Sequence, residues 1–149
     1  MRARLTLATS EHFERLEPLV SAFHREEGLT LSPQAREAAL APLLDGSPLG
    51  AIYLIGPVRG PIGYIILSFG WSIEFGGMDG FIDELYIRPS VRGRGIASEV
   101  LASLPSALSE VGLKALHLEV SDENAPAQRL YEKAGFLRRT HYRLMTRTF

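Results

Sequence analysis

Two neighbouring apolar runs in the middle of the chain set the strongest limit on the fold. Residues 51–55 and 62–69 are rich in branched apolar side chains, and the glycine- and proline-rich stretch 56–61 separates them. Glycine and proline favour turns, so the pattern predicts two strands joined by a hairpin-type turn. Strands with so few polar side chains are typically buried on both faces. The fold must therefore place helices on both sides of a sheet.

The patterns around these two strands complete a mixed α/β (α+β) fold. Alternating or apolar runs predict further strands at 5–7, 81–88, 115–120 and 136–146, and helical spacing predicts helices at 10–27, 33–44, 96–111 and 124–134. The predicted order is β-α-α-β-β-β-α-β-α-β, which is a mixed central sheet of about six to seven strands flanked by helices. The glycine-rich stretch 70–80 is predicted to be a loop. Pro18 is expected to kink or divide the first helix, and Pro105 to bend the third.

Length and composition indicate one ordinary globular domain over residues 1–149. Hydrophobic residues make up 46% of the 149 residues and charged residues 22%, with no repeat or long linker. The formal net charge of −1 provides no overall field to attract nucleic acid or an anionic membrane. The chain has no cysteine, no signal-peptide pattern and no apolar run long enough for a membrane span. We therefore expect a cytoplasmic protein that binds neither nucleic acid nor membranes.

The residues most informative about function follow the predicted strand 81–88. Gly93 and Gly95 lie just before the predicted helix that starts at Ile96, and Arg92 and Arg94 alternate with them. Backbone N–H groups in the first turn of a helix have no partner within the helix, and the helix dipole makes that end positive. Glycines allow a phosphate to approach the backbone closely. The segment therefore predicts an anion site, although a strand-to-helix turn with two solvated arginines would have the same residues.

Two common phosphate-binding motifs do not match this segment. A P-loop requires Lys-Ser or Lys-Thr after the glycines, and the chain has neither there. A dinucleotide fingerprint would need a third glycine where Ser98 stands. It would also follow a buried apolar strand, whereas the strand here contains Asp83 and Glu84. A nucleotide-binding protein of unrelated fold is therefore a minor alternative.

The segment resembles the GNAT superfamily of N-acetyltransferases. Arg92, Gly95 and Ala97 match the pattern R/Q-x-x-G-x-G/A after a strand, and residues 124–136 match a second landmark of that family. The resemblance implies that acetyl-CoA is the cofactor and that an amine attacks its acetyl group directly in a ternary complex. It also implies that the loop, the preceding strand and the second landmark contact the cofactor. These implied contacts are Leu85, Tyr86, Ile87, Arg92, Gly93, Arg94, Gly95, Ile96, Ala97, Asn124 and Tyr131.

The resemblance also suggests catalytic side chains. Tyr131 stands where the family has a tyrosine that acts as general acid toward the sulfur of CoA. A phenol with a pKa near 10 gives its proton to a thiolate whose acid has a pKa near 8.5 only at a cost of roughly 2 kcal/mol. Unless its pKa is lowered, we therefore expect Tyr131 to donate a hydrogen bond to the departing sulfur.

Asp83 and Glu84 are the candidates for accepting the proton of the amine. Because they are adjacent in a strand, they are expected to point to opposite faces, so only one would face a given cleft. Strand alternation predicts one face with Phe81, Asp83, Leu85 and Ile87, and the other with Ile82, Glu84 and Tyr86. A structural acid paired with an arginine is the alternative role for either carboxylate.

The amine itself is less well defined by the sequence. Asp83-Glu84 followed by residues 95–101 is similar to the diamine and polyamine acetyltransferase branch, which implies an acidic, aromatic pocket for a cation. Side chains predicted to bind the substrate are Glu27, Trp71, Glu74 and Asp83. The four histidines lack metal-ligand spacing, so no metal site is predicted. A non-catalytic acyl-CoA-binding module remains the alternative to an enzyme, and exposed aromatic residues could support a homodimer.

Overall fold

The computed structural model describes residues 3–149, which form two compact units that divide between Glu119 and Val120. The prediction of one domain over residues 1–149 stays a prediction. The first unit contains β1 (Leu5–Leu7), α1 (Phe13–Glu27), α2 (Pro33–Leu44), β2 (Gly50–Ile55), β3 (Gly63–Ser72), β4 (Gly77–Ile87), α3 (Ile96–Ala107) and β5 (Ala115–Leu118). It also has two short 3₁₀ turns, Ser10–His12 and Pro89–Val91. The second unit contains α4 (Ala125–Lys133).

The strands form one mixed sheet in the order β1-β2-β3-β4-β5. Strands β1 to β4 pair with one another in antiparallel order, and β5 pairs with β4 in parallel. A parallel pair requires a crossover connection, which α3 provides. The predicted mixed sheet with flanking helices is confirmed.

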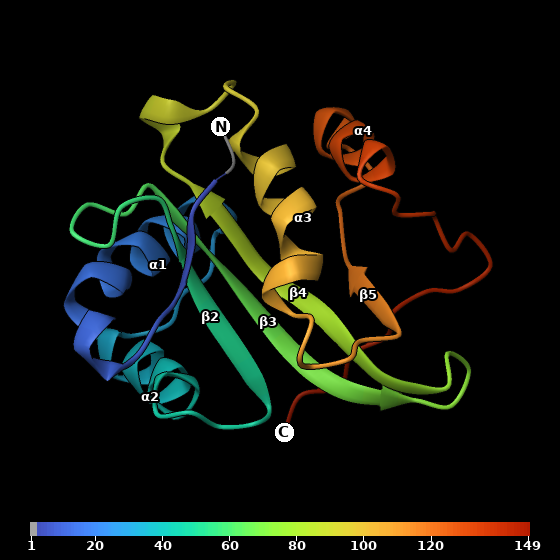
Figure 1. Ribbon diagram of the computed structural model, residues 1–149, viewed down its shortest axis with the longest axis horizontal. Coiled ribbons are helices and arrows are strands. Elements are labelled where there is room, and N and C mark those ends of the chain that lie inside the picture. The colour runs from blue at the N-terminus through green and yellow to red at the C-terminus, as the bar shows by residue number, and fades with distance from the viewer. Residues whose placement is uncertain (1–2) are drawn as a thin grey trace. The chain divides into compact units, whose positions relative to one another are not determined.

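Helices cover both faces of the sheet, as the apolar strands required. In Figure 1, α1 and α2 lie on one face and α3 lies on the other. Leu16, Leu19 and Val20 of α1 pack with Tyr64 and other buried side chains of the strands in one core cluster. Val100, Leu101 and Leu104 of α3 are also buried. The central strands are therefore shielded from water on both faces.

The helix ends follow the predicted capping residues, whereas the prolines act differently from expectation. The Ser32 Oγ accepts a hydrogen bond from the Ala35 N–H at 3.1 Å, and α1 ends at Gly28, whose φ is 71°. Pro18 lies within one continuous α1, so the helix is not divided there, and the alternative expectation of a kink stays a prediction. Helix α3 ends at Ala107 rather than at residue 111, although the helical hydrogen bonds continue past Pro105, where the Leu108 N–H donates to the Leu104 carbonyl at 2.9 Å.

The predicted loop at residues 70–80 is wrong for most of its length. Strands β3 and β4 remain paired as far as Ser72 and Gly77, so only residues 73–76 form the turn. Glycine is present in this ladder because of close packing. A Cβ atom at Gly80 would lie 3.1 Å from the side chains of both Leu113 and Leu116. Glycines therefore mark tight packing here as well as a turn.

The predicted sixth or seventh strand at 136–146 is not formed. Among the described residues the sheet has five strands, and residues 136–149 contain no strand. An alternating pattern describes which side chains could share a face, but a strand also needs a neighbour for its N–H and C=O groups. No such ladder is present for this segment. In residues 3–149, no helix has the length and apolar character needed to cross a bilayer.

Candidate functional site

The loop before α3 forms a cradle of unpaired backbone donors. Gly93 and Gly95 have φ values of 78° and 76°, a left-handed conformation that favours glycine. Within residues 3–149, the Arg92 N–H donates to the Pro89 carbonyl, and the next backbone N–H that donates a hydrogen bond is that of Glu99, to the Gly95 carbonyl at 3.1 Å. The N–H groups of residues 93–98 therefore have no partner, and the positive end of the 12-residue α3 adds to their charge. A Cβ atom at either glycine would meet nothing within 4 Å, so the cradle is open.

The two arginines of this loop have different surroundings. Arg92 Nη2 donates to both carboxylate oxygens of Glu26 at 2.8 Å, and Arg92 Nε donates to the Ile87 carbonyl at 2.8 Å. The hydrogen bond to Glu26 raises the pKa of Arg92, which stays charged. Arg92 thus connects the loop to the end of α1 and to β4. Arg94 is exposed and has no side-chain partner within the described chain, so it is the arginine available to an anion.

Strand β4 continues beyond its parallel neighbour. The pairing with β5 covers Asp79 to Ile82 and ends there, whereas β4 remains paired with β3 as far as Ile87. Residues 84–87 therefore have a ladder partner on one edge only. Leu85, Tyr86 and Ile87, predicted from the family resemblance to contact the cofactor, lie in this part of the strand.

A β-bulge changes the direction of the two adjacent carboxylates. Ile82 lies opposite Leu67 of β3. Glu84 lies opposite the next residue, Ile66, and Asp83 between them has no partner in the register. Directly opposed residues share a face, and adjacent residues of β3 point to opposite faces. The extra residue therefore places Ile82 and Glu84 on opposite faces. The simple alternation predicted for residues 81–87 is wrong for this reason.

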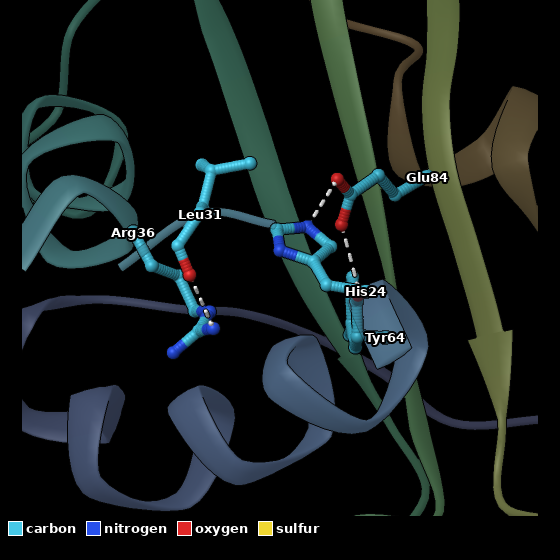
Figure 2. A network of polar contacts seen from close by, with 5 residues as sticks. All are labelled: His24, Leu31, Arg36, Tyr64 and Glu84. Atoms are coloured by element: carbon cyan, nitrogen blue, oxygen red, sulfur yellow. Dashed lines mark hydrogen bonds and ion pairs between the residues drawn. The ribbon is translucent and has the colours of Figure 1, made fainter. Parts of the chain in front are cut away.

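Glu84 lies at the centre of a polar network that connects three elements. Figure 2 shows its carboxylate between His24 of α1 and Tyr64 of β3. The His24 Nε2 lies 2.8 Å from Glu84 Oε2, and the Tyr64 hydroxyl donates to Glu84 Oε1 at 2.7 Å. Burial, and next the charge of Glu84, raise the pKa of Tyr64, so its hydroxyl keeps its proton. Both oxygens of Glu84 thus already have a partner.

Sequence reasoning missed the role of His24. This side chain is only 5% exposed, and its Nδ1 is buried without a hydrogen-bond partner among the described residues. His24 follows Val20 by four residues and thus continues the apolar face of α1. A histidine on the buried face of a helix is the one signal that could have pointed to a polar partner in the core.

A pocket lies beside this network, between α1, α2 and β4. Its volume is about 210 Å³, and it is lined by Val20, His24, Leu29, Leu31, Arg36, Ala39, Leu40, Leu43, Ile66, Asp83 and Glu84. Both carboxylates line it, so the expectation that only one could face a given cleft is wrong, and the bulge explains why. Asp83 is exposed and has no hydrogen-bond or ion-pair partner in the described part of the chain, in contrast to Glu84.

Arg36 contributes no free charge to this pocket. Its Nη1 donates to Glu17 Oε1 at 2.8 Å, and its Nη2 donates to the Leu31 carbonyl at 3.2 Å. Arg36 is only 8% exposed. Because Glu17 pairs with the guanidinium and His24 pairs with Glu84, Asp83 is the carboxylate of the lining that has no partner among the described residues.

The other residues predicted to bind the substrate do not line this pocket. Glu27 is exposed at the last position of α1. Trp71 is 71% exposed near the far end of the β3–β4 hairpin, and Glu74 is in its turn. Of the predicted substrate-binding set, the pocket thus contains Asp83 alone.

The predicted residues of the second unit lie in α4 and directly before it. The Asn124 Oδ1 accepts from the Ala127 N–H at 3.1 Å, so this side chain caps the helix. The rings of Tyr131 and Phe136 meet edge to face at 5.9 Å between centroids. Burial raises the pKa of the Tyr131 phenol, which makes it a weaker proton donor. In the region described, no group of three or more His, Cys, Asp or Glu side chains could hold a metal ion.

Comparisons with known proteins agree on the family of the chain. A model described as "Acetyltransferase (GNAT) family" matches residues 13–136. Thialysine N-epsilon-acetyltransferase of Bos taurus is 30% identical over 82 residues, which are 54% of this chain and 48% of that protein. The chain thus matches about half the length of this curated relative.

Solved structures extend the similarity to the whole fold. An integron cassette protein from the mobile metagenome of Cole Harbour Salt Marsh is 31% identical with a TM-score of 0.81, covering 97% of this chain and 89% of that one. A predicted acetyltransferase from Clostridium acetobutylicum, solved with acetyl-CoA, has a TM-score of 0.76 at 18% identity. That alignment covers 97% of this chain and 96% of the other, and at this identity it shows a common fold.

The network around Glu84 leads to a testable prediction about stability. Tyr64→Phe is expected to lower the free energy of unfolding at pH 7 by about 1.5 to 3 kcal/mol, because a hydrogen bond to a charged group is lost. The raised pKa of Tyr64 means that its contribution is complete below pH 10 and declines as the pH rises further. The difference between wild type and variant should therefore shrink by about 0.8 kcal/mol at pH 10.5.

Urea unfolding at pH 7 and pH 10.5 measures the loss of unfolding free energy in the variant and its dependence on pH. Tyr142→Phe is the control. Because Tyr142 is 71% exposed, this substitution should change neither the unfolding free energy nor its pH dependence. A difference between wild type and Tyr64→Phe that is the same at the two pH values would contradict the interpretation.

Proposed function

The chain belongs to the acetyltransferase (GNAT) family, and from that premise we propose that it is an N-acetyltransferase that transfers an acetyl group from acetyl-CoA to the primary amine of a small molecule or peptide. The observation that carries the proposal is the combination of two features at β4. The unpaired N–H groups of residues 93–98 suit the phosphates of CoA, and the carboxylate pocket suits an ammonium group.

The residues of the loop fit the proposed cofactor. Six consecutive backbone donors, two glycines without side chains and the exposed Arg94 together provide hydrogen bonds and positive charge for a pyrophosphate. The unpaired edge of β4 at residues 83–87 can hydrogen-bond the amide groups and the acetyl carbonyl of a thioester that lies along it. Acetyl-CoA supplies the activated acetyl group. In this proposal Arg92 acts mainly through its backbone, because Glu26 holds its side chain.

We assign different roles to the two carboxylates of the pocket. An ammonium group with a pKa near 10.4 is almost fully protonated at neutral pH and must lose a proton before it can attack. Asp83 has free oxygens and accepts this proton, directly or through water. Glu84 already accepts hydrogen bonds from Tyr64 and pairs with His24, so it supplies a fixed negative charge that attracts the ammonium group.

Tyr131 completes the proposed mechanism. As the nitrogen–carbon bond forms and the carbon–sulfur bond breaks, negative charge develops on the departing sulfur. Because burial raises the pKa of Tyr131, full proton transfer from this phenol becomes less favourable, and a hydrogen bond to the sulfur is its better role. Once the nitrogen–carbon bond has formed, the nitrogen still carries one proton more than an amide has, and this proton passes through water to the thiolate.

The remaining alternatives can be weighed on the same residues. A non-catalytic acyl-CoA-binding module would need the cradle but would not need an unpaired aspartate in a pocket, so the pocket favours an enzyme. Similarity to a thialysine N-epsilon-acetyltransferase supports a primary amine as acceptor and the diamine and polyamine branch as the nearest one. A homodimer and a cytoplasmic location remain predictions from the sequence.

Ligand-dependent melting tests the cradle. Acetyl-CoA at about 100 times its Kd should add near 2.7 kcal/mol and raise the Tm by several degrees, whereas NAD and ATP should not. Gly95→Ala should weaken acetyl-CoA binding about tenfold, because it adds a side chain at the mouth of the cradle. Gly112→Ala is the matched control, since Gly112 has a similar φ of 71° and open space around it. Equal loss of affinity in the two variants would refute the cradle.

Kinetics separate the two carboxylates. Asp83→Asn should lower kcat by about 10²- to 10⁴-fold at pH 7, which is the usual contribution of a general base. The loss should become smaller toward pH 10, where the free amine needs no base. Glu84→Gln should mainly raise KM for the amine. A larger, pH-dependent loss of kcat in Glu84→Gln than in Asp83→Asn would reverse the assignment.

Tyr131→Phe tests the hydrogen bond to the sulfur. The variant should release CoA more slowly in the presence of an amine, while its Tm shift with acetyl-CoA stays close to that of wild type. We expect a loss of kcat of about tenfold to a hundredfold, as for one charge-assisted hydrogen bond. Unchanged kcat would remove Tyr131 from the mechanism.

A further inference from the structure

We propose that the pocket between α1, α2 and β4 selects an amine whose non-reacting part is short, aliphatic and uncharged. The inference rests on the proposed function, because it concerns the acceptor of the same reaction. Seven of the eleven lining residues are apolar. Two of these, Leu29 and Leu31, remain 46% and 38% exposed, so the pocket presents apolar surface that a ligand could cover.

The charges of the pocket favour a single cation at one wall. Asp83 and Glu84 are adjacent on β4 and are the only carboxylates of the lining. The remaining polar side chains are His24, which pairs with Glu84, and Arg36, which pairs with Glu17. A second ammonium group placed against the apolar wall would therefore have no partner, and burial without a partner is costly for a charge. A carboxylate there would meet a guanidinium whose two terminal nitrogens already donate to Glu17 and to a carbonyl, and whose one unpartnered nitrogen among the described contacts, Nε, is buried.

The size of the pocket sets the length of the aliphatic part. A volume of about 210 Å³ corresponds to roughly seven water molecules at about 30 Å³ each. A linear amine of five to seven non-hydrogen atoms fits within that volume, whereas the far end of a long polyamine would lie outside the pocket.

Helix α2 determines this size through a small residue. Arg36, Ala39, Leu40 and Leu43 all line the pocket, and their spacing of three, four and seven residues places them on one face of the helix. Ala39 is the smallest of the four, and it is exposed. A larger side chain at this position would reduce the pocket without disturbing the buried core. Ala38 is also exposed, but it does not line the pocket.

The first experiment compares three acceptors of equal chain length with acetyl-CoA and wild-type protein. These are n-butylamine, putrescine and 4-aminobutyrate, which end in a methyl, an ammonium and a carboxylate group. We expect kcat/KM for n-butylamine to exceed that of the other two by about tenfold or more. In the series from ethylamine to hexylamine, kcat/KM should rise about fourfold per methylene group until the pocket is full.

The second experiment uses two matched variants. Ala39→Leu should lower the ratio of kcat/KM for hexylamine to that for ethylamine by about tenfold or more, because it adds three carbon atoms to the wall. Ala38→Leu should leave this ratio unchanged. The Tm shift with acetyl-CoA, measured for both variants, checks that the cofactor site is intact.

The outcomes distinguish the two proposals. Preferred use of putrescine, as the resemblance to the polyamine branch implies, would support the acetyltransferase and overturn the inference about the pocket. Preferred use of 4-aminobutyrate would also support the acetyltransferase and overturn the inference about the pocket, and it would indicate that Arg36 binds a carboxylate. Equal ratios in Ala39→Leu and Ala38→Leu would also overturn it. If no amine of either panel releases CoA, the proposed function fails and the inference fails with it.

Discussion

Glu84 is the residue on which the arrangement of this site depends. Its carboxylate lies in a largely buried position between α1, β3 and β4, and it accepts from the Tyr64 hydroxyl and pairs with the His24 ring. Removing a carboxylate from water costs several kcal/mol unless hydrogen bonds compensate it. The two contacts therefore connect a helix to two strands. Replacing any one of the three side chains leaves a buried polar group without its hydrogen-bond partner. Such a network specifies one position of α1 over the sheet.

The bulge in β4 determines how the two carboxylates of the pocket differ. Without the extra residue, Asp83 would lie in the ladder and would point away from Glu84. With it, Glu84 stays on the face of α1 and α2, and Asp83 lines the same pocket with its oxygens free. One carboxylate is held by hydrogen bonds and the other is available to a ligand. Two residues of similar chemistry thus acquire different surroundings from one irregularity of the backbone.

Local signals in the sequence predicted much of the fold. Ser32 before Pro33 identified the start of α2, and Gly28 identified the end of α1, because capping depends on a few neighbouring residues. The cradle before α3 was predictable for the same reason. Glycines with positive φ and the first turn of a helix are local features.

Features that depend on distant residues could not be predicted in this way. The register shift between β3 and β4 involves two strands, and no residue of β4 alone shows where it occurs. The pairing of His24 with Glu84 joins residues 60 positions apart. Gly80 looked like part of a loop, because the close packing of Leu113 and Leu116 that favours a glycine comes from a later part of the chain. The roles of Tyr131 and Asn124 in catalysis and cofactor binding remain predictions from the resemblance.

In the proposed reaction, the opposite charges of the two halves of the site explain how a nearly neutral chain would bind two charged reactants. At a net charge of −1 the protein as a whole attracts neither phosphates nor amines strongly. The negative pocket begins at Asp83, and β4 ends at Ile87 just before the loop with the positive cradle. At about 3.3 Å per residue these positions are about 13 Å apart along one strand. This exceeds the screening length of roughly 8 Å at physiological salt, so each reactant meets mainly the charge of its own half. The strand between them, with one unpaired edge, is then the place where the two reactants can meet.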